Sequence, residues 1–423
     1  MSEQGTTEKA NRRILTGMLA GQVLGEGLVV LPGQGNSLAI DTDAGVVVID
    51  ASGYPHAPAM IETLRRHTNA PVHAIVYSHG HLGYNSAVDV WQAHNAERGD
   101  PPIRLVAHER LVARYARYAE TEGLQTRLAA IQFPSRHPLE QRRELFVQHP
   151  PTETFRDTLT LVDGSRRVEL IYSPSEVDDA VALWLPDDGL LAAGPATPGD
   201  AIPNIGTPLR TQRFTIRWAD TLDRLDGLGA ERLMTEFGPM VEGADAVHHR
   251  LGEMARALRW LREQVVERLN RGMGEGEILA DMTYPVELFA QPWMKPNYGS
   301  PDYIVRDLFR EETGWWDRNP TTLHPAPEPD AAAAVLSAIA DTTTVLARTR
   351  ELAAQGQIQL ALHVVDLLAL APGDDPDVVA ARTLKAELCR TRAGEVKPFV
   401  SRSCYHSSAS LLDEGHTSWT ELR

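Results

Sequence analysis

The chain has 423 residues and is acidic, with 57 Asp and Glu against 41 Lys and Arg and a formal net charge of -16. This balance argues against nucleic acid as a partner, and no run of Lys or Arg predicts binding to an anionic membrane. Two cysteines, Cys389 and Cys404, predict no disulfide scaffold and fit a reducing, cytoplasmic setting. The polar stretch 1–13 lacks the apolar core of a signal peptide, and no apolar run is long enough to span a bilayer.

The first part of the chain predicts hairpins followed by an α/β layer. Apolar runs separated by glycine-containing turns predict strands at 28–31, 37–40 and 46–50. A helix and two further apolar strands are predicted at 59–67, 72–76 and 103–107. Strand, helix and strand at this spacing predict a layer stacked on the early hairpins.

The middle of the chain returns to strands after a charged, mostly helical insertion at 108–150. Strands are predicted at 167–172, 180–185, 190–193 and 231–235, with a helix at 213–228. The segment 197–212 is rich in Pro and Gly, which predicts an irregular loop of the kind that often carries active-site residues.

From about residue 246 the pattern changes to helices. An amphipathic helix is predicted at 258–272 and an irregular aromatic segment at 292–325. Antiparallel helices then follow at 331–355, 358–370 and 376–392, with Ala/Leu spacing that resembles tetratricopeptide hairpins. We expect a packing or dimerisation module here.

Two histidines, His79 and His81, follow the apolar strand 72–76 with one residue between them. His-x-His on a loop that leaves a strand puts two imidazoles on one side of the backbone, where they can share a metal ion. The spacing alone leaves a second interpretation open, that of two solvated loop histidines.

The surrounding segments resemble a known family. Strands ending in Val-Val-Val-Ile-Asp at 46–50 and a strand running into Ser-His-Gly-His at 78–81 look like the metallo-β-lactamase fold. Downstream, Tyr-Gly-Ser-Pro at 298–301, Glu-Thr-Gly-Trp-Trp-Asp-Arg-Asn-Pro at 312–320 and Arg-Ser-Cys-Tyr at 402–405 resemble the alkylsulfatase dimerisation domain. The chain is thus similar to the zinc-dependent alkylsulfatases over almost all of its length.

This resemblance implies the fold class and the assembly. We expect an αββα metallo-β-lactamase sandwich over residues 1–245, followed by an all-α dimerisation domain over residues 246–423. We also expect the chain to form a homodimer through the second domain.

The resemblance also implies a ligand set for one metal ion. The two histidines, His79 and His81, match the family's first metal site, and Glu176 matches the carboxylate that follows a Pro-Gly-Thr-like turn. Zinc is the expected metal, at about one ion per chain, although the same set of two imidazoles and one carboxylate also suits iron, and manganese stays open.

The family's second metal site is changed in this chain. Its Asp and His positions hold Gly83 and Tyr84, and the position of its bridging Glu holds Gly194. Its last histidine falls near Glu236. We therefore expect Glu236 to act as a general base or as a fourth ligand, and Tyr84 to fill the vacated space or to donate a hydrogen bond to substrate.

Five further residues match family positions near the substrate, and they are expected to bind it. The loop contributes Asn204, Thr207 and Arg210, although their spacing differs by one residue from the family's Asn-x-x-Thr-x-Arg segment. The second half contributes Tyr298 and Arg306. An arginine suits a sulfate or carboxylate because its planar fork gives two parallel hydrogen bonds.

Three other residues are expected to lie outside the metal and substrate sites. We expect Asp50, at the end of its strand, to brace a loop rather than to bind metal. We expect Asp179 to lie in a solvated turn, although it follows Glu176 closely, and His108 to lie on the surface.

The function implied is that of a metal-dependent hydrolase acting on a small anionic or ester-like substrate. Two alternatives stay open: a one-metal lyase or non-haem iron oxygenase on the same scaffold, and a non-catalytic dimeric homologue. The sequence names neither the substrate nor the pathway.

Overall fold

The computed structural model describes residues 17, 19–133 and 146–421, so the polar start predicted at 1–13 lies outside the described residues. It divides into two compact units, Met1–Glu122 with His137–Phe309, and Gly123–Arg136 with Arg310–Arg423. The domain boundary predicted near residue 245 stays a prediction.

The first unit contains two sheets. The first sheet has the order β1-β2-β3-β4-β5-β6-β7. Its early strands pair antiparallel, and the pairs from β4 to β7 are parallel. The strands are β1 (Val23–Gly25), β2 (Leu28–Gly33), β3 (Gly35–Thr42), β4 (Gly45–Ile49), β5 (Val72–Val76), β6 (Arg104–His108) and β7 (Glu153–Phe155).

The second sheet has the order β13-β12-β11-β10-β9-β8 and is antiparallel except between β11 and β12. Its strands are β8 (Thr158–Val162), β9 (Val168–Tyr172), β10 (Val181–Leu185), β11 (Leu190–Gly194), β12 (Arg232–Thr235) and β13 (Val241–Glu242). A short 3-10 turn, Pro186–Asp188, connects β10 to β11.

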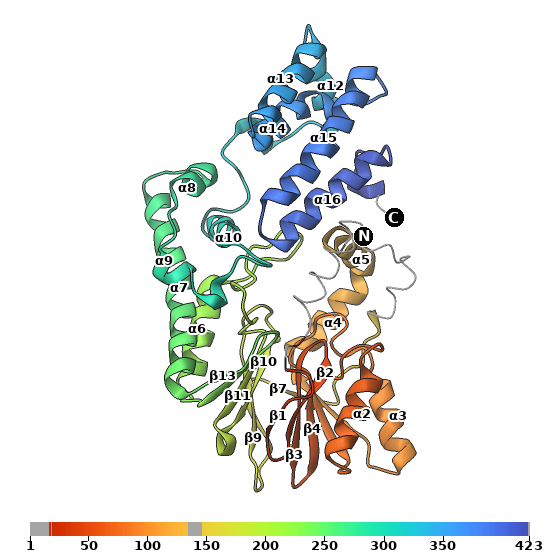
Figure 1. Ribbon diagram of the computed structural model, residues 1–423, viewed down its shortest axis with the longest axis vertical. Helices are drawn as coiled ribbons and strands as arrows, with labels where there is room; N and C mark the ends of the chain where they lie inside the picture. Colours follow the sequence, from red (N-terminus) through yellow and green to blue (C-terminus); the bar gives the residue numbers. More distant parts are fainter. Residues whose placement is uncertain (1–16, 18, 134–145, 422–423) are drawn as a thin grey trace. The chain divides into compact units, whose positions relative to one another are not determined.

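The two sheets pack face to face between layers of helices (Figure 1). The inner core contains apolar residues of both sheets, such as Val47, Val76 and Leu183. The outer face of the first sheet packs on α2 (Ala57–His67), α3 (Val88–Arg98) and α4 (Arg110–Glu120). The outer face of the second packs on α6 (Thr215–Asp226) and α7 (Ala244–Asn270). The predicted αββα sandwich is therefore confirmed.

The parallel strand pairs bring distant loops to the same edge of each sheet. In the first sheet Ile49 pairs with Val76, so Asp50 and the loop after β5 leave together. In the second sheet Gly194 pairs with Thr235, which brings Gly194 and Glu236 together. Loops at the carboxyl ends of parallel strands are where sites are commonly built.

The helices after β13 correct two predictions made for the first unit. The helix predicted at 258–272 is the last part of the longer α7, whose first half buries Val247 and Leu251. The segment predicted as irregular contains α10 (Pro301–Thr313), which begins at a proline, a favourable first helical residue. The smaller elements here are α8 (Glu275–Asp281), α9 (Val286–Phe289) and the 3-10 turn Pro292–Met294.

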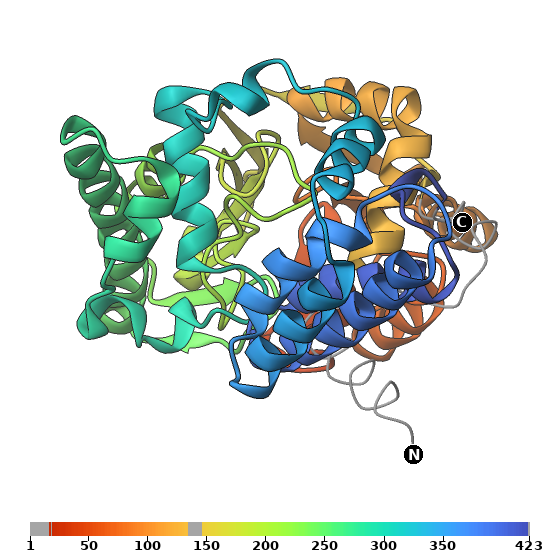
Figure 2. The ribbon, with the colours of Figure 1, turned by 90° about the horizontal axis from the view of Figure 1, so that it is seen from above.

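The second unit is helical, and its later helices lie side by side (blue in Figure 2). It comprises α5 (Glu122–Gln132), α11 (Pro320–Leu323), α12 (Glu328–Ser337), α13 (Thr342–Ala354), α14 (Ile358–Ala369), α15 (Pro376–Glu395), α16 (Phe399–Asp413) and the 3-10 turn Trp419–Glu421. The single helix predicted at 331–355 is wrong, because Asp341 caps a new helix by accepting hydrogen bonds from Thr343 and Thr344.

Among the helices of the described residues, none alone has the length and apolar character needed to cross a membrane. One pair, α12 with α13, passes that test by length and composition, and the chain bends by 103° between its two helices.

Candidate metal centre

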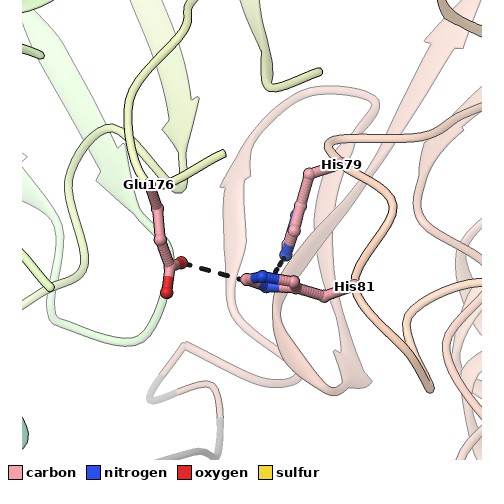
Figure 3. Close-up of side chains that lie close together, drawn as sticks. All are labelled: His79, His81 and Glu176. Carbon is pink, nitrogen blue, oxygen red and sulfur yellow. Dashed lines mark hydrogen bonds and ion pairs between the residues drawn. The ribbon is translucent and has the colours of Figure 1, made fainter. Parts of the chain in front are cut away.

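The two histidines of the His-Gly-His motif lie on the loop after β5, and Glu176 reaches them from the loop between β9 and β10 (Figure 3). The Nε2 atom of His79 lies 2.8 Å from Nδ1 of His81. That Nδ1 atom lies 3.9 Å from Oε2 of Glu176. One ligand atom from each residue falls within 4.8 Å of the others, so the three side chains converge on one point.

The chemistry of these three groups fits a metal ion. Burial lowers the pKa of both His79 and His81 well below the usual histidine value, and nearby charges such as that of Arg213 add to the effect at His81. Both imidazole rings are therefore neutral, and each can donate a nitrogen lone pair to a metal ion. The side chain of His79 is fully buried, whereas His81 keeps a quarter of its surface exposed. An open side of this kind is typical of catalytic rather than structural zinc sites.

Asp50 braces the histidine loop, as expected. Its carboxylate accepts hydrogen bonds from the backbone N–H of Ser78 (2.9 Å), the hydroxyl of Ser78 and the side-chain amide of Asn85 (2.8 Å). The Ser78 hydroxyl in turn lies 2.9 Å from Nδ1 of His79. Such contacts fix the direction of a metal-binding imidazole.

Two side chains from the loop between β11 and α6 hold Glu176. The amide of Asn204 donates to Oε1 at 2.7 Å, and the guanidinium of Arg213 lies 2.9 Å from the same oxygen. Oε1 is thereby engaged, and Oε2 is the oxygen that faces His81. Arg213 was expected only as the first residue of the helix 213–228, because the family's Asn-x-x-Thr-x-Arg spacing pointed to Arg210 instead.

Of the five residues expected to bind substrate, four lie near this centre. Thr207 donates a hydrogen bond to Asn204, which itself contacts Glu176. Burial raises the pKa of Tyr298 to about 12, and the charge of Arg210 beside it opposes that rise. In contrast, Arg306 is half exposed and forms an ion pair with Glu275. The structure does not bring Arg306 to the cluster.

Two other expectations were wrong. Asp179 is fully buried rather than solvated, because it accepts hydrogen bonds from Arg114 and from the backbone of Gly80. His108 is also buried, and its ring stacks on Tyr172 at a centroid distance of 3.9 Å. Asp179 follows polar, turn-like sequence and His108 lies just beyond the apolar run predicted as a strand, and the partners that bury them are distant in the chain.

Comparison with known proteins places this geometry in a family. Residues 30–235 match the metallo-beta-lactamase superfamily, and residues 274–415 match the alkyl sulfatase dimerisation family. The chain belongs to the metallo-β-lactamase-fold alkylsulfatase family. That family comprises metal-dependent hydrolases.

The chain is similar to alkylsulfatases along most of its length. It is 25% identical over 394 residues to a linear primary-alkylsulfatase from a Pseudomonas strain, covering 88% of this chain and 73% of that protein. It is 23% identical to an (R)-specific secondary-alkylsulfatase of Pseudomonas sp., covering 90% of this chain and 60% of that one. The solved structure of a stereoselective inverting sec-alkylsulfatase from Pseudomonas sp. aligns at a TM-score of 0.79 and 20% identity, covering 94% of this chain and 66% of that one. This last likeness supports the shared fold.

In this member of the alkylsulfatase family, Tyr84 and Glu236 meet where the resemblance implies a second metal. The Tyr84 hydroxyl donates a hydrogen bond to Oε1 of Glu236, and the Tyr84 ring lies 4.2 Å from that of His79. Oε2 of Glu236 is buried without a hydrogen-bond partner among the described residues. Both side chains line a small cavity together with Asp50 and Gly194.

The ionisation of this pair follows from its burial. Burial, together with the negative charge of Glu176, raises the pKa of the Glu236 carboxyl well above its usual value. Burial also raises the pKa of the Tyr84 hydroxyl, and the neighbouring charge of Glu236 adds to the rise. The hydrogen bond from Tyr84 opposes the rise in the pKa of Glu236, and the Tyr84 hydroxyl keeps its proton as the donor of that hydrogen bond.

Proposed function

We propose that the chain is a hydrolase of the alkylsulfatase type that works with one metal ion, zinc, and acts on a small anionic or ester-like substrate. The observation that carries the proposal is the asymmetry of the site. His79, His81 and Glu176 bring ligand atoms within 4.8 Å of one another. At the positions that match the family's second metal site, Tyr84 is hydrogen-bonded to Glu236 instead.

In this proposal His79, His81 and Glu176 hold the ion. When bound there, the metal supplies Lewis acidity and lowers the pKa of a coordinated water. Asp50 and Ser78 orient His79, while Asn204 and Arg213 orient Glu176. The four orienting side chains are buried, and the low local dielectric strengthens each of these electrostatic contacts.

Glu236 is the proposed proton-transfer group. Its raised pKa is in the direction that a general acid or base at neutral pH requires. Its Oε2 atom has no hydrogen-bond partner among the described residues, and Glu236 lines the small cavity that Gly194 also lines, where a single water molecule is proposed to bind. Tyr84 holds the other oxygen and so fixes the direction of the carboxyl group.

The negatively charged end of the substrate is proposed to meet Arg210 with Tyr298. Arginine binds sulfate and carboxylate groups through two parallel hydrogen bonds. The neighbouring Arg213 is already engaged by Glu176 and by the carbonyl of Asn204, so its charge adds to the local field without requiring a direct contact.

A non-haem iron oxygenase is the second candidate, because two imidazoles and one carboxylate are also the donor set of that enzyme class. It differs from the first in metal and in co-substrate. Activity that needs iron and molecular oxygen would favour it, whereas sulfate release from an alkyl sulfate with zinc favours the hydrolase.

The test uses purified full-length protein, a series of alkyl sulfates and carboxylic esters, and the variant Glu236→Gln. We expect product release from at least one substrate class, and a loss of at least about 100-fold in kcat for the variant with unchanged metal content. Glu242→Gln is the matched control, since Glu242 is exposed on the neighbouring β13. Loss of the metal in Glu236→Gln would make Glu236 a ligand, and unchanged kcat would make it a bystander.

A further inference from the structure

The residue between the two histidines, Gly80, lies against a buried ion pair. A Cβ atom added to Gly80 would lie 2.7 Å from Oδ2 of Asp179 and 2.8 Å from Cδ of Arg114. Both distances are shorter than side-chain contacts allow. The small residue in the His-Gly-His motif therefore leaves room for these two side chains to reach the backbone of the loop.

Asp179 binds that backbone directly. Its Oδ2 atom accepts a hydrogen bond from the Gly80 N–H at 2.8 Å, and its Oδ1 atom accepts one from Nε of Arg114 at 2.6 Å. The Asp179 side chain has no exposed surface. A buried carboxylate without a partner is costly, so the contact with Gly80 depends on the charge of Arg114.

Asp179 also lies three residues after Glu176, in the same loop between β9 and β10. The hydrogen bond from Gly80 thus joins the loop that carries Glu176 to the loop that carries His79 and His81. The buried carboxylate of Asp179 therefore connects the two loops that carry the candidate metal ligands.

Arg114 lies on α4, in the charged segment between β6 and β7. It also forms an ion pair with Asp178, and only 12% of its side-chain surface is exposed. Arg110, one turn earlier on α4, lies 3.7 Å from Asp178 and is 55% exposed. The two arginines face the same acidic pair, but of the two only Arg114 has an ion pair with Asp179 among the described residues.

We propose that Arg114 is a positioning residue for the metal centre. Through Asp179 it fixes the peptide between His79 and His81, and it holds the Glu176 loop at the distance at which the three ligands converge. This inference rests on the metal site of the proposed function. It assigns to α4, an element outside both sheets, the task of setting the ligand geometry.

The test compares Arg114→Lys with its matched control, Arg110→Lys, in the full-length protein. A lysine keeps the charge but offers a point donor in place of a planar fork, so it cannot hold Asp178 and Asp179 in the same way. Zinc affinity is measured by competition with a chromogenic chelator. We expect Arg114→Lys to weaken zinc binding by about 10-fold, the lower end of the effect of residues that orient ligands, and Arg110→Lys to leave it unchanged.

A second readout separates positioning from mere folding. The visible absorption of the cobalt-substituted protein reports the geometry of the ligands, and circular dichroism with thermal melting of the metal-free protein reports the fold. We expect a changed cobalt spectrum for Arg114→Lys and an unchanged one for Arg110→Lys. If Arg114→Lys does not fold, Asp179→Asn decides, because it removes the carboxylate that joins Arg114 to the Gly80 N–H while Arg114 keeps its ion pair with Asp178. It is expected to weaken zinc binding in the same direction.

Equal zinc affinity and equal cobalt spectra for Arg114→Lys and the unmodified chain would overturn the inference while leaving the metal centre in place. The same outcome for Asp179→Asn, where that variant decides, would also overturn it. A failure of the unmodified chain to bind zinc would overturn both the inference and the proposed function, so the two failures are distinguishable.

Discussion

Asp50 is a buried carboxyl group whose ionisation is linked to the stability of the first unit. Burial raises its pKa from the ordinary 3.8 to about 6, although hydrogen bonds from Ser78 and Asn85 oppose the rise. Because the folded-state pKa lies above the unfolded one, the folded state binds the proton more tightly between these values. Stability is therefore full below about pH 4 and is lost as pH rises through about 6.

We predict that Asp50→Asn removes this pH dependence. Between pH 4 and pH 7 the free energy of unfolding of the metal-free, unmodified chain is expected to fall, and the fall should exceed that of the variant by on the order of 3 kcal/mol. This difference follows from the shift in the pKa of Asp50. Urea unfolding at several pH values measures it. Asp163→Asn, at an exposed residue, is the control and is expected to parallel the unmodified chain. Parallel curves for Asp50→Asn would contradict the assignment.

At the scale of single residues, sequence patterns located the candidate ligands better than the residues that orient them. His79, His81 and Glu176 stand in short motifs, so spacing and resemblance could find them. Arg213 and the Arg114–Asp179 pair are recognisable only once the fold brings distant loops together. The role of Arg306 as a substrate-binding residue stays a prediction that its pairing with Glu275 does not support.

The loop between β11 and α6 is held against α10 by one glycine. Gly206 has a positive φ of +65°, and a Cβ there would lie 2.0 Å from the carbonyl oxygen of Tyr303. The loop carries Asn204, which contacts Glu176. The close approach of two backbones therefore helps to place a residue that orients a candidate ligand.

We predict that Gly206→Ala forces the loop away from α10 and destabilises the chain. Gly229→Ala is a matched control, since Gly229 has a similar φ of +69° with nothing within 4 Å. Both variants carry the cost of the left-handed backbone, so their difference reports the clash. We expect Gly206→Ala to be less stable than the control by about 1–3 kcal/mol in chemical unfolding. Equal stabilities would show that the loop can move without cost.

At the scale of elements, apolar runs predicted the central strands of both sheets because burial on two faces requires them. The strands β1, β7, β8 and β13 were missed, since none has a continuous apolar pattern over its full length. The helix α10 was also missed, because prolines and aromatic residues precede it and hide its spacing. The helix α10 is stabilised by packing against the helices that cover the second sheet, rather than by local helix propensity.

At the scale of the whole molecule, we predict a homodimer. Residues 274–415 match a dimerisation family, and α14 leaves Leu360 and Leu367 about half exposed. Apolar side chains in such positions are typical of surfaces that are covered in an assembly. Light scattering at micromolar concentration is expected to give the mass of two chains. A single-chain mass would contradict the prediction. The cytoplasmic setting expected from the cysteine content also stays a prediction.

The measurement that bears most directly on the central claim is the number of metal ions per chain. Elemental analysis of the purified full-length protein is expected to give about one zinc ion per chain, because three ligands converge at one point and Tyr84 with Glu236 occupies the counterpart of the second. His81→Ala is expected to lose that ion, and His248→Ala, at an exposed histidine, to keep it. Two ions per chain, or none, would contradict the account.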